Sequence, residues 1–333
     1  MHPDNISIRQ GLDHPWAPAQ SAAKPQAISP CQRAAMSLRH VLLAILIMAI
    51  WGFNFVVIRF GLDAFPPLLF NGLRFTVASL PFLLFLRSPG VPWRWVLGTG
   101  LVLGIMKFSL LFLAMNNGLP AGLASVVMQA QALFSVVFAA LLLSERPGPL
   151  QWAGLSIAAL GLGVIGIDMG LEASFVAFAI AICAAACWGF ANILTRKAAA
   201  PNPLAFIVWV GAVPPLPMFA LSWVFEGEAQ ITTALGSLDL RGILSVLYIG
   251  LLSTTACFAA WSLLLRQYSA SLVAPFTLLV PVFGLASAGL VLGETPSALK
   301  FAGAGLILLG LMVNAGLLRR LLGRLFARRP AVA

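Results

Sequence analysis

The sequence predicts an all-α integral membrane protein whose ten transmembrane helices form two inverted five-helix repeats. First, the chain is 60% hydrophobic and only 9% charged, whereas a soluble domain usually carries about 25% charged residues. Second, apolar runs of about 20 residues, the length that crosses a ~30 Å hydrocarbon core as a helix, recur along the whole chain. Third, two phrases from the first half return in the second half.

Ten apolar runs give the expected helices in order. They cover residues 38–58, 66–86, 95–115, 121–142, 150–167, 173–195, 203–225, 241–265, 270–292 and 299–318. None of these runs alternates polar and apolar residues as the strands of a transmembrane barrel do. The connections between them are short, so we expect no inserted soluble domain.

The two ends of the chain differ from the helical part. Residues 1–35 contain several prolines and polar residues but no apolar run, which is typical of a disordered tail. Met36 begins the phrase "MSLRH", so we interpret this tail either as a dispensable extension or as the result of a start codon assigned too early. Residues 319–333 are rich in arginine, and we expect a basic cytoplasmic tail that either contacts anionic lipid headgroups or is frayed.

Two phrases occur twice in the chain. "AIWGFNFVVIRFGL" at 49–62 returns as "ACWGFANILTRKAA" at 186–199, which is 137 positions later. A longer phrase at 121–154 returns in altered form at 270–303, which is 149 positions later. The chain therefore contains an internal duplication.

The longer phrase aligns Glu145 with Glu294 and helps to set the limits of the two repeats. We place the first five-helix repeat at 36–168 and the second at 173–318. Because five is an odd number of crossings, the second copy is expected to enter the membrane upside down. Inverted repeats of this kind recur in secondary transporters, which bind their substrates between the two halves.

The basic residues are unevenly distributed between the two sides of the membrane if ten helices cross it and the N-terminus lies inside. Fifteen of them fall on inner segments, whereas the outer connections hold only Arg59, Arg241 and Lys300. This asymmetry is what the positive-inside rule describes. It predicts that both termini are cytoplasmic, and it accounts for the net charge of +10 without a nucleic-acid partner.

Several of these phrases resemble one family. They are "WGFNF" at 51–55, "LRF" at 73–75, "PAGLASVVMQAQALFS" at 120–135 and "APFTLLVPVFGLASA" at 274–288. Over residues 38–318 the chain resembles the EamA family of the drug/metabolite transporter superfamily. The resemblance implies an inner-membrane carrier that moves small metabolites outward. The two long phrases are most similar to those of bacterial exporters of cysteine and O-acetylserine.

Two cations lie inside the expected helices, where charge is costly and therefore marks a candidate site. Lys107 lies near the middle of its run, whereas Arg74 is close enough to an outer end to extend its side chain to the interface instead. The resemblance supports Arg74, because an arginine at this place recurs in the family. Lys107 departs from the neutral polar residue that related exporters often carry.

Each Trp-Gly-Phe phrase places a tryptophan and an asparagine on one helical face. Asn54 follows Trp51 by three residues, and Asn192 follows Trp188 by four. Trp51 lies well inside its run, which an aromatic belt at the membrane interface does not explain. We interpret both pairs as cavity-lining. The alternative is helix packing in which each asparagine bonds to a neighbouring helix.

Further polar, aromatic and proline residues complete the candidate set. Gln129 and Gln131 are two residues apart and face different directions, so at most one is expected to reach the cavity. Two prolines of the ninth helix are expected to kink it and to free backbone carbonyls. These helix-kinking residues are Pro275 and Pro281. Weaker candidates for cavity aromatics are Tyr248 and Trp261.

Residue types that are missing from the expected helices exclude several functions. No Asp or Glu falls inside any of the ten runs, and all three histidines precede the first run. This argues against a metal site, a histidine-based active site and a carboxylate proton relay within the membrane. The sequence also lacks a phosphate-binding P-loop that would couple this chain to ATP. We expect no enzyme activity, no cofactor and no metal.

We therefore expect a secondary transporter that exports cysteine, O-acetylserine or similar amino-acid metabolites across the bacterial inner membrane by alternating access. A mostly apolar cavity with one or two cations and tryptophan faces suits a carboxylate and an ammonium group. One alternative is an exporter of broader substrates such as aromatic amino acids or drugs. Another is a membrane sensor that does not transport. The oligomeric state is left open.

Overall fold

The computed structural model describes residues 36–169 and 173–317, so the two predicted tails lie outside the described residues. Within these ranges every regular element is a helix, with no strand, as the sequence predicts. Eight helical stretches of 19 to 28 residues are long and apolar enough to cross a membrane. The two remaining runs coincide with helices of 17 residues, α2 (Pro67–Leu83) and α16 (Ala298–Asn314). The all-helical fold with several candidate membrane spans is confirmed, and ten crossings stay a prediction.

The first half of the described chain forms five helical stretches from nine elements. In order they are α1 (Leu38–Ala64), α2, α3 (Trp93–Thr99), the π-helix η2 (Gly100–Lys107), α4 (Phe108–Asn116), α5 (Ala121–Val127), the 3-10 helix η3 (Met128–Ala130), α6 (Gln131–Leu143) and α7 (Pro149–Met169). α1 is longer than its apolar run. Arg59 and Asp63, one helical turn apart, form an ion pair of 3.1 Å and favour this extension.

The second half repeats the pattern in eleven elements, because the second of its helical stretches is broken in two and one short helix is added. Its elements are α8 (Ala173–Ala198), α9 (Pro203–Gly211), α10 (Pro215–Phe225), α11 (Glu228–Gly236), α12 (Leu240–Leu247), the π-helix η4 (Tyr248–Ala256), α13 (Cys257–Gln267), α14 (Ala270–Val273), the 3-10 helix η5 (Ala274–Leu278), α15 (Leu279–Leu292) and α16. The additional helix is α11. It occupies the connection that makes the second half longer than the first.

The irregular helical segments occupy equivalent places in the two halves. Residues 100–107 form the π-helix η2, and 149 positions later residues 249–256 fall within the π-helix η4. The 3-10 helix η3 likewise overlaps the end of η5 at the same offset. These local deviations from α-helical geometry support the internal duplication independently of the repeated phrases.

The glycine of each Trp-Gly-Phe phrase lets two helices approach closely. A Cβ atom on Gly52 of α1 would lie 2.5 Å from Phe283 Cβ of α15. A Cβ atom on Gly189 of α8 would lie 2.6 Å from Phe134 Cβ of α6. Phe134 and Phe283 are themselves 149 positions apart. The same helix–helix interface is therefore built twice, once between α1 and α15 and once between α8 and α6.

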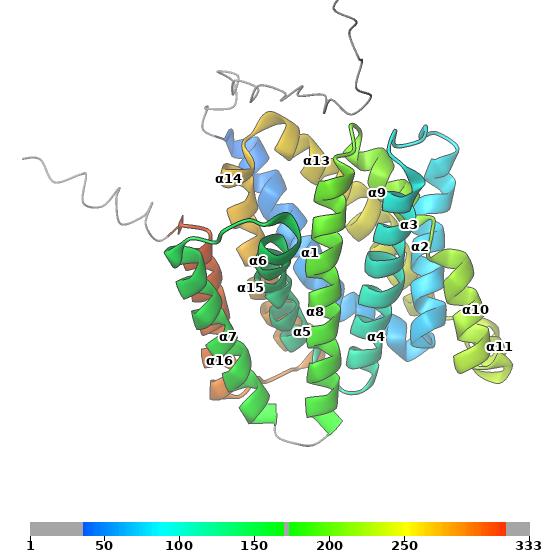
Figure 1. Ribbon diagram of the computed structural model, residues 1–333. Helices are drawn as coiled ribbons and strands as arrows, with labels where there is room; N and C mark the ends of the chain where they lie inside the picture. Colours follow the sequence, from blue (N-terminus) through cyan, green and yellow to red (C-terminus); the bar gives the residue numbers. More distant parts are fainter. Residues whose placement is uncertain (1–35, 170–172, 318–333) are drawn as a thin grey trace, which may run out of the picture.

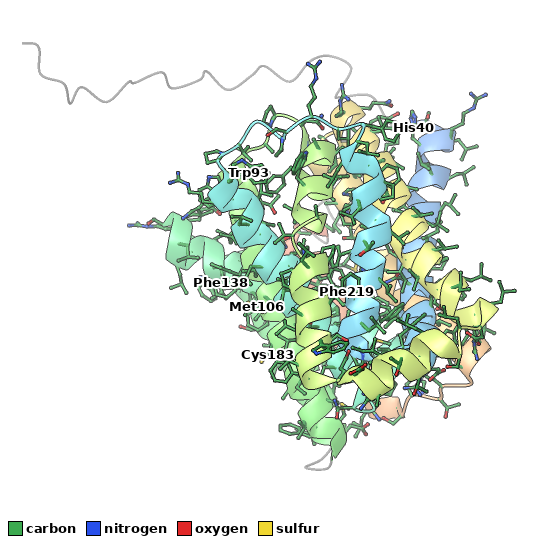
Figure 2. The ribbon with its side chains drawn as sticks, turned by 90° about the vertical axis from the view of Figure 1, so that its right-hand side faces the viewer. His40, Trp93, Met106, Phe138, Cys183 and Phe219 are labelled. Carbon is green, nitrogen blue, oxygen red and sulfur yellow. The ribbon has the colours of Figure 1, made fainter. Side chains whose placement is uncertain are left out.

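Corresponding helices run in opposite directions (Figure 1). α1 starts at the upper end of the bundle, whereas α8 starts at the lower end and runs upward. The C-terminal end of α16 lies at the same upper end as the start of α1. Figure 2 places His40 of α1 at this end, where its Nδ1 lies 2.8 Å from the hydroxyl of Tyr268. This antiparallel relationship is the one that an inverted repeat requires.

The last helices of the two repeats, α7 and α16, pack backbone to backbone. A Cβ atom on Gly161 of α7 would lie 2.6 Å from the carbonyl oxygen of Gly303, and one on Gly154 would lie 2.6 Å from that of Gly310. Small residues allow such close contact between membrane helices, where dispersion and not water exclusion drives association.

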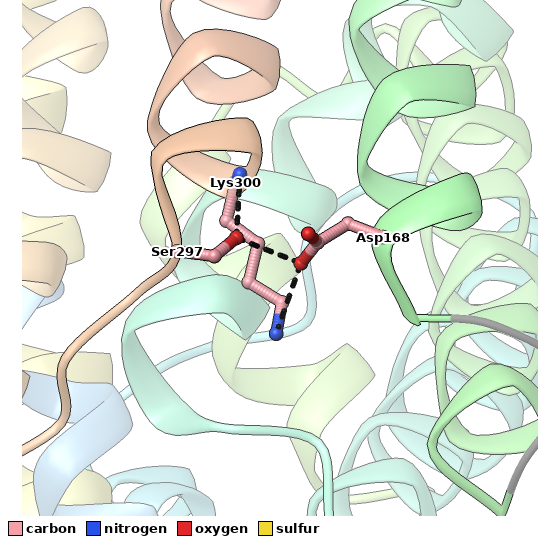
Figure 3. Close-up of polar contacts among 3 residues, drawn as sticks. All are labelled: Asp168, Ser297 and Lys300. Atoms are coloured by element: carbon pink, nitrogen blue, oxygen red, sulfur yellow. Dashed lines mark hydrogen bonds and ion pairs between the residues drawn. The ribbon is translucent and has the colours of Figure 1, made fainter.

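A polar contact joins the same two helices at the lower end of the bundle (Figure 3). The Ser297 hydroxyl donates a hydrogen bond of 2.8 Å to the carboxylate of Asp168, at the end of α7. The Lys300 ammonium lies 3.3 Å from that carboxylate. Ser297 also caps the start of α16 by accepting a 3.1 Å bond from the Lys300 amide. The contact fixes the two helix ends relative to one another.

Candidate functional site

Two cations are buried in the middle of the bundle. Arg74 of α2 is 3% exposed, and Lys107, the last residue of η2, is 4% exposed. A buried charge is costly unless it is paired. In the part of the chain that the structure describes, neither cation forms an ion pair with an Asp or Glu. The two basic side chains therefore lie together without a described carboxylate as a partner.

The aromatic ring of Phe108 holds the two cations together. Its centroid lies 3.8 Å from Arg74 Cζ and 3.3 Å from Lys107 Nζ. Lys107 Nζ is also 4.5 Å from the ring of Trp188 in α8. Cation–π contacts of this kind stabilise each charge by about 0.5–2 kcal/mol, far less than the cost of burying an unpaired ion. The rings orient the cations without neutralising them.

Arg74 has hydrogen-bonding capacity that the protein does not use. Its Nη2 donates a 2.9 Å bond to Thr254 Oγ1 in the π-helix η4. Its Nε and Nη1 atoms are buried and have no hydrogen-bond partner. A guanidinium group with unused donors can bind a carboxylate through charge-assisted hydrogen bonds. The arrangement is suited to binding an anion.

The π-helix η2 sets the position of Lys107. Gly104 lies so close to the second half that a Cβ atom there would be 2.2 Å from Pro214. Asn71 of α2 donates a 3.0 Å hydrogen bond to the carbonyl oxygen of Gly104. π-Helical segments of this length are rare and are often found at functional sites. Here the segment is held between α2 and the break that separates α9 from α10.

A polar stripe on α8 runs from this site towards the upper end of the bundle. Trp188, Asn192 and Arg196 follow one another at four-residue intervals and so share one helical face. The Asn192 Nδ2 donates bonds of 2.7 Å to Gln131 Oε1 and 3.0 Å to Ser135 Oγ of α6. The stripe therefore leads along α8 from Trp188, which contacts Lys107, to the amide group of Asn192 and the charged group of Arg196.

The stripe ends at a polar cavity of about 220 Å³. Arg196 Nη2 lies there 2.5 Å from the carboxylate of Glu145, and both side chains are about half exposed. The cavity is lined by Ser135, Val136, Ala139, Glu145, Arg146, Pro147, Gln151 and Arg196. A larger hollow of about 560 Å³ lies between α7 and α8, but all seven residues that line it are apolar. The polar cavity, unlike the larger hollow, is therefore lined by charged and amide groups.

The remaining aromatic candidates form a separate cluster. Trp51 Nε1 donates a 2.9 Å bond to the Ser253 carbonyl oxygen, and the Tyr248 hydroxyl donates a 2.9 Å bond to that of Ile50. The rings of Trp51 and Trp261 lie 5.6 Å apart. The side chains of Trp51 and Tyr248 thus donate hydrogen bonds to backbone carbonyls and join α1 to η4. This cluster connects the two halves of the protein rather than meeting the buried cations.

The other predicted site residues have contacts of their own. Gln129 is buried and donates a 3.2 Å bond to the Thr277 carbonyl oxygen, which joins η3 to η5. The Oδ1 atom of Asn54 is buried and has no hydrogen-bond partner. Pro275 lies in η5, and Pro281 is the third residue of α15. Because the equivalent segment η3 contains no proline, its 3-10 geometry does not depend on this residue type.

Sequence reasoning missed Phe108 and Thr254, although both contact Arg74. A signal for Thr254 exists in the phrase "STTA", a polar interruption of an otherwise apolar run. Phe108 carries no such signal, because aromatic residues are common in membrane helices. Its role follows from the positions of the two cations that it contacts.

Comparison with known proteins supports the sequence resemblance. Residues 38–167 and 175–316 each match the EamA-like transporter family. The chain is 41% identical over 286 residues to a protein of Salmonella typhimurium named probable amino-acid metabolite efflux pump, covering 84% of this chain and 95% of that protein. A protein of Escherichia coli K12 with the same name is 39% identical over 285 residues, with the same two coverages.

More distant proteins agree with this relationship. The chain is 29% identical over 289 residues to a probable terminal-alkyne amino-acid exporter of Streptantibioticus cattleyicolor, covering 84% of this chain and 93% of that protein. A crystal structure of a protein that is 22% identical covers 85% of this chain and 99% of that protein, with a TM-score of 0.59, and supports the fold alone. Two family matches, one for each repeated half, and relatives that align over most of the chain show that this protein belongs to the EamA-like transporter family.

Proposed function

We propose that the protein is a secondary transporter that exports small amino-acid metabolites, such as cysteine or O-acetylserine, across the bacterial inner membrane by alternating access. Ten helices cross the bilayer as two inverted five-helix repeats, and both termini are cytoplasmic. The names of the relatives in Salmonella typhimurium and Streptantibioticus cattleyicolor support the substrate class and the outward direction. The substrate is the only small molecule required, and the bilayer is the other partner.

The observation that carries this proposal is the uncompensated pair of Arg74 and Lys107. Every amino-acid metabolite with a free α-carboxylate can supply the anionic partner that these two side chains do not have within the described part of the protein. Because the surroundings exclude water, a charge-assisted hydrogen bond here is stronger than the same bond at the protein surface. The carboxylate accepts a hydrogen bond from a free donor of Arg74, with Lys107 beside it.

The rings around the cations favour small substrates over the aromatic alternative. The guanidinium of Arg74 already contacts the rings of Phe75, at 4.7 Å, and Phe112, at 5.9 Å, in addition to Phe108. These side chains fill the space beside the carboxylate site. An ammonium group of the substrate would meet the face of an aromatic ring, which attracts cations in the absence of an acid. The polar stripe on α8 leads from the upper cavity to this place.

Counterflow of radiolabelled cysteine and O-acetylserine in proteoliposomes tests the proposal. Arg74→Gln and Lys107→Met remove one cation each, and the loss of a charge-assisted bond of about 1.5–3 kcal/mol should raise the substrate dissociation constant about tenfold or more. The matched controls Arg59→Gln and Lys197→Met remove exposed cations and should leave affinity unchanged. Unchanged affinity in both site variants, at equal amounts of folded protein, would exclude the carboxylate site.

A further inference from the structure

Two glutamates end equivalent helices of the two repeats with the same local backbone. Ser144 and Gly293 both adopt a left-handed conformation, with φ of 54° and 69°. The amides of Glu145 and Glu294 then donate 3.3 Å bonds to Ala139 and Ala288, which are 149 positions apart. The backbone therefore presents the two glutamates in the same way at opposite ends of the bundle.

The side chain of Glu294 joins the two repeats at the lower end. Its carboxylate accepts bonds of 2.7 Å and 2.9 Å from the amides of Ala121 and Gly122, at the start of the helical stretch 121–143. The first amides of a helix have no partner within it, and Pro120 provides no side-chain cap. Glu294 satisfies two of these amides from the other repeat.

A second carboxylate makes the same kind of contact at the same end. Glu226, which follows α10, accepts bonds of 2.6 Å and 3.0 Å from the amides of Leu68 and Leu69 at the start of α2. It also accepts a 2.6 Å bond from the hydroxyl of Ser222. Both glutamates belong to the second repeat, and both cap helices of the first. The lower end is therefore held together by contacts between the repeats.

Glu145 makes a different contact at the upper end. The position related by the repeat to Ala121 is Ala270, at the start of α14. The carboxylate of Glu145 is instead paired with Arg196 at the mouth of the polar cavity. Equivalent glutamates with equivalent backbones thus have different partners.

The two ends of the bundle also differ in how deeply their residues are buried. Residues 125–129, beside the Glu294 contact, are all buried. The five residues related to them by the repeat, 274–278, include no buried residue. At the lower end the stacked rings of Phe70 and Phe112, with centroids 5.1 Å apart, are fully buried. The residues beside the Glu294 contact are therefore buried, whereas their counterparts at the upper end are partly or fully exposed.

We propose that Glu294 and Glu145 are alternating latches that hold opposite ends of the transporter closed. In the present arrangement Glu294 binds the start of α5 and the upper cavity is open. In the other arrangement Glu294 releases α5, Glu145 leaves Arg196, and its carboxylate binds the backbone amides at the start of α14. The proposal rests on the alternating-access part of the proposed function. It adds the two residues that exchange partners and the groups that they bind.

Thiol labelling at two repeat-related positions tests this exchange. Ser125→Cys and Ala274→Cys each provide one reporter in a chain whose Cys31, Cys183, Cys187 and Cys257 are replaced by alanine. In detergent-solubilised protein, where the reagent reaches both ends, a maleimide should label position 274 faster than position 125, because Ser125 is 1% exposed. Glu294→Ala should raise the labelling rate at position 125 about a hundredfold, as expected for the loss of two charge-assisted bonds. It should also lower the rate at position 274.

The double variant separates a latch from a structural contact. Adding Glu145→Ala to Glu294→Ala removes the latch of the other arrangement and should return labelling at position 125 towards its original rate. Glu228→Ala, which removes an exposed carboxylate of α11 at the same end, is the matched control and should change neither rate. An unchanged rate at position 125 in Glu294→Ala would overturn the proposal. A further rise on adding Glu145→Ala would overturn it as well, because it indicates general loosening.

The labelling is measured without substrate, so the two proposals can fail separately. If the labelling rates change as expected but no tested amino-acid metabolite is transported, the latch proposal stands and the proposed substrate class is wrong. If O-acetylserine is transported but neither glutamate substitution changes the labelling rates, the proposed function stands and the latch proposal is wrong.

Discussion

Arg74 and Lys107, which are 33 positions apart, lie against the same ring, that of Phe108, with no carboxylate paired to either in the described part of the chain. Like charges brought together in a medium of low dielectric repel each other strongly. A fold retains such a pair at a cost in stability. The cost is understandable if a substrate anion offsets it during transport.

The ring of Phe108 should stabilise the protein in the absence of substrate. Phe108→Leu removes cation–π contacts to both charges and should lower the free energy of unfolding by about 2 kcal/mol. Thermal unfolding in detergent measures this as a lower Tm. Phe85→Leu changes a ring that is 82% exposed and should have almost no effect. Equal stability of the Phe108→Leu variant and the unaltered protein would show that the ring does not hold the cations.

The glycine of the first Trp-Gly-Phe phrase should tolerate no larger side chain. Gly52→Val places atoms where Phe283 already lies, and overpacking of this kind should destabilise the protein by about 1–3 kcal/mol. Gly163→Ala is the control, because no atom lies within 4 Å of the added Cβ and alanine favours a helix over glycine. Thermal stability should fall in the first variant and stay equal or rise in the second. A tolerated valine at position 52 would contradict the close approach of α1 and α15.

The sequence predicts the helical stretches, the duplication and two cations within the helices because each depends on local composition or on a repeated phrase. For Arg74 it leaves open whether the side chain is buried or extends to the interface. It does not predict Thr254 as the partner of Arg74, because the two residues are 180 positions apart and meet through the geometry of η4. The two extra turns of α1 were also missed. There, Arg59 and Asp63 end the apolar run but pair with each other and continue the helix.

The roles of the two glutamates could not be assigned from the sequence for a similar reason. Glu145 and Glu294 occupy matching phrases in connections between apolar runs. Whether such a carboxylate binds a helix start or an arginine depends on how the two repeats are packed. Local sequence does not encode the difference between two arrangements of the same chain.

The topology should be inverted between the repeats. Pro147→Cys and Pro296→Cys, introduced singly into a chain without other cysteines, mark the connections after α6 and α15. The charge asymmetry predicts that position 147 is labelled only from the cytoplasm and position 296 only from the periplasm. Labelling of intact cells and of inverted vesicles measures the two sides. Labelling of both positions from the same side would contradict the inverted repeat.

Transport should proceed without a pH gradient. The ten apolar runs of the sequence contain no Asp or Glu, so no carboxylate is present in mid-membrane to carry a proton. Counterflow of O-acetylserine should therefore have the same rate with equal pH on both sides and with an imposed gradient. Strict dependence on the gradient would point to proton binding at the helix ends, at Glu145 or Glu294.

Competition by a substrate analogue without its carboxylate tests the central claim most directly. The unaltered protein should bind O-acetylserine at least about tenfold more tightly than its methyl ester, because the ester cannot form a charge-assisted bond with Arg74 or Lys107. In the double variant Arg74→Gln, Lys107→Met this preference should disappear, whereas the exposed controls Arg59→Gln and Lys197→Met should retain it. Equal affinity of the unaltered protein for acid and ester, or a preference that survives in the double variant, would contradict the assignment of the buried cations to the substrate carboxylate.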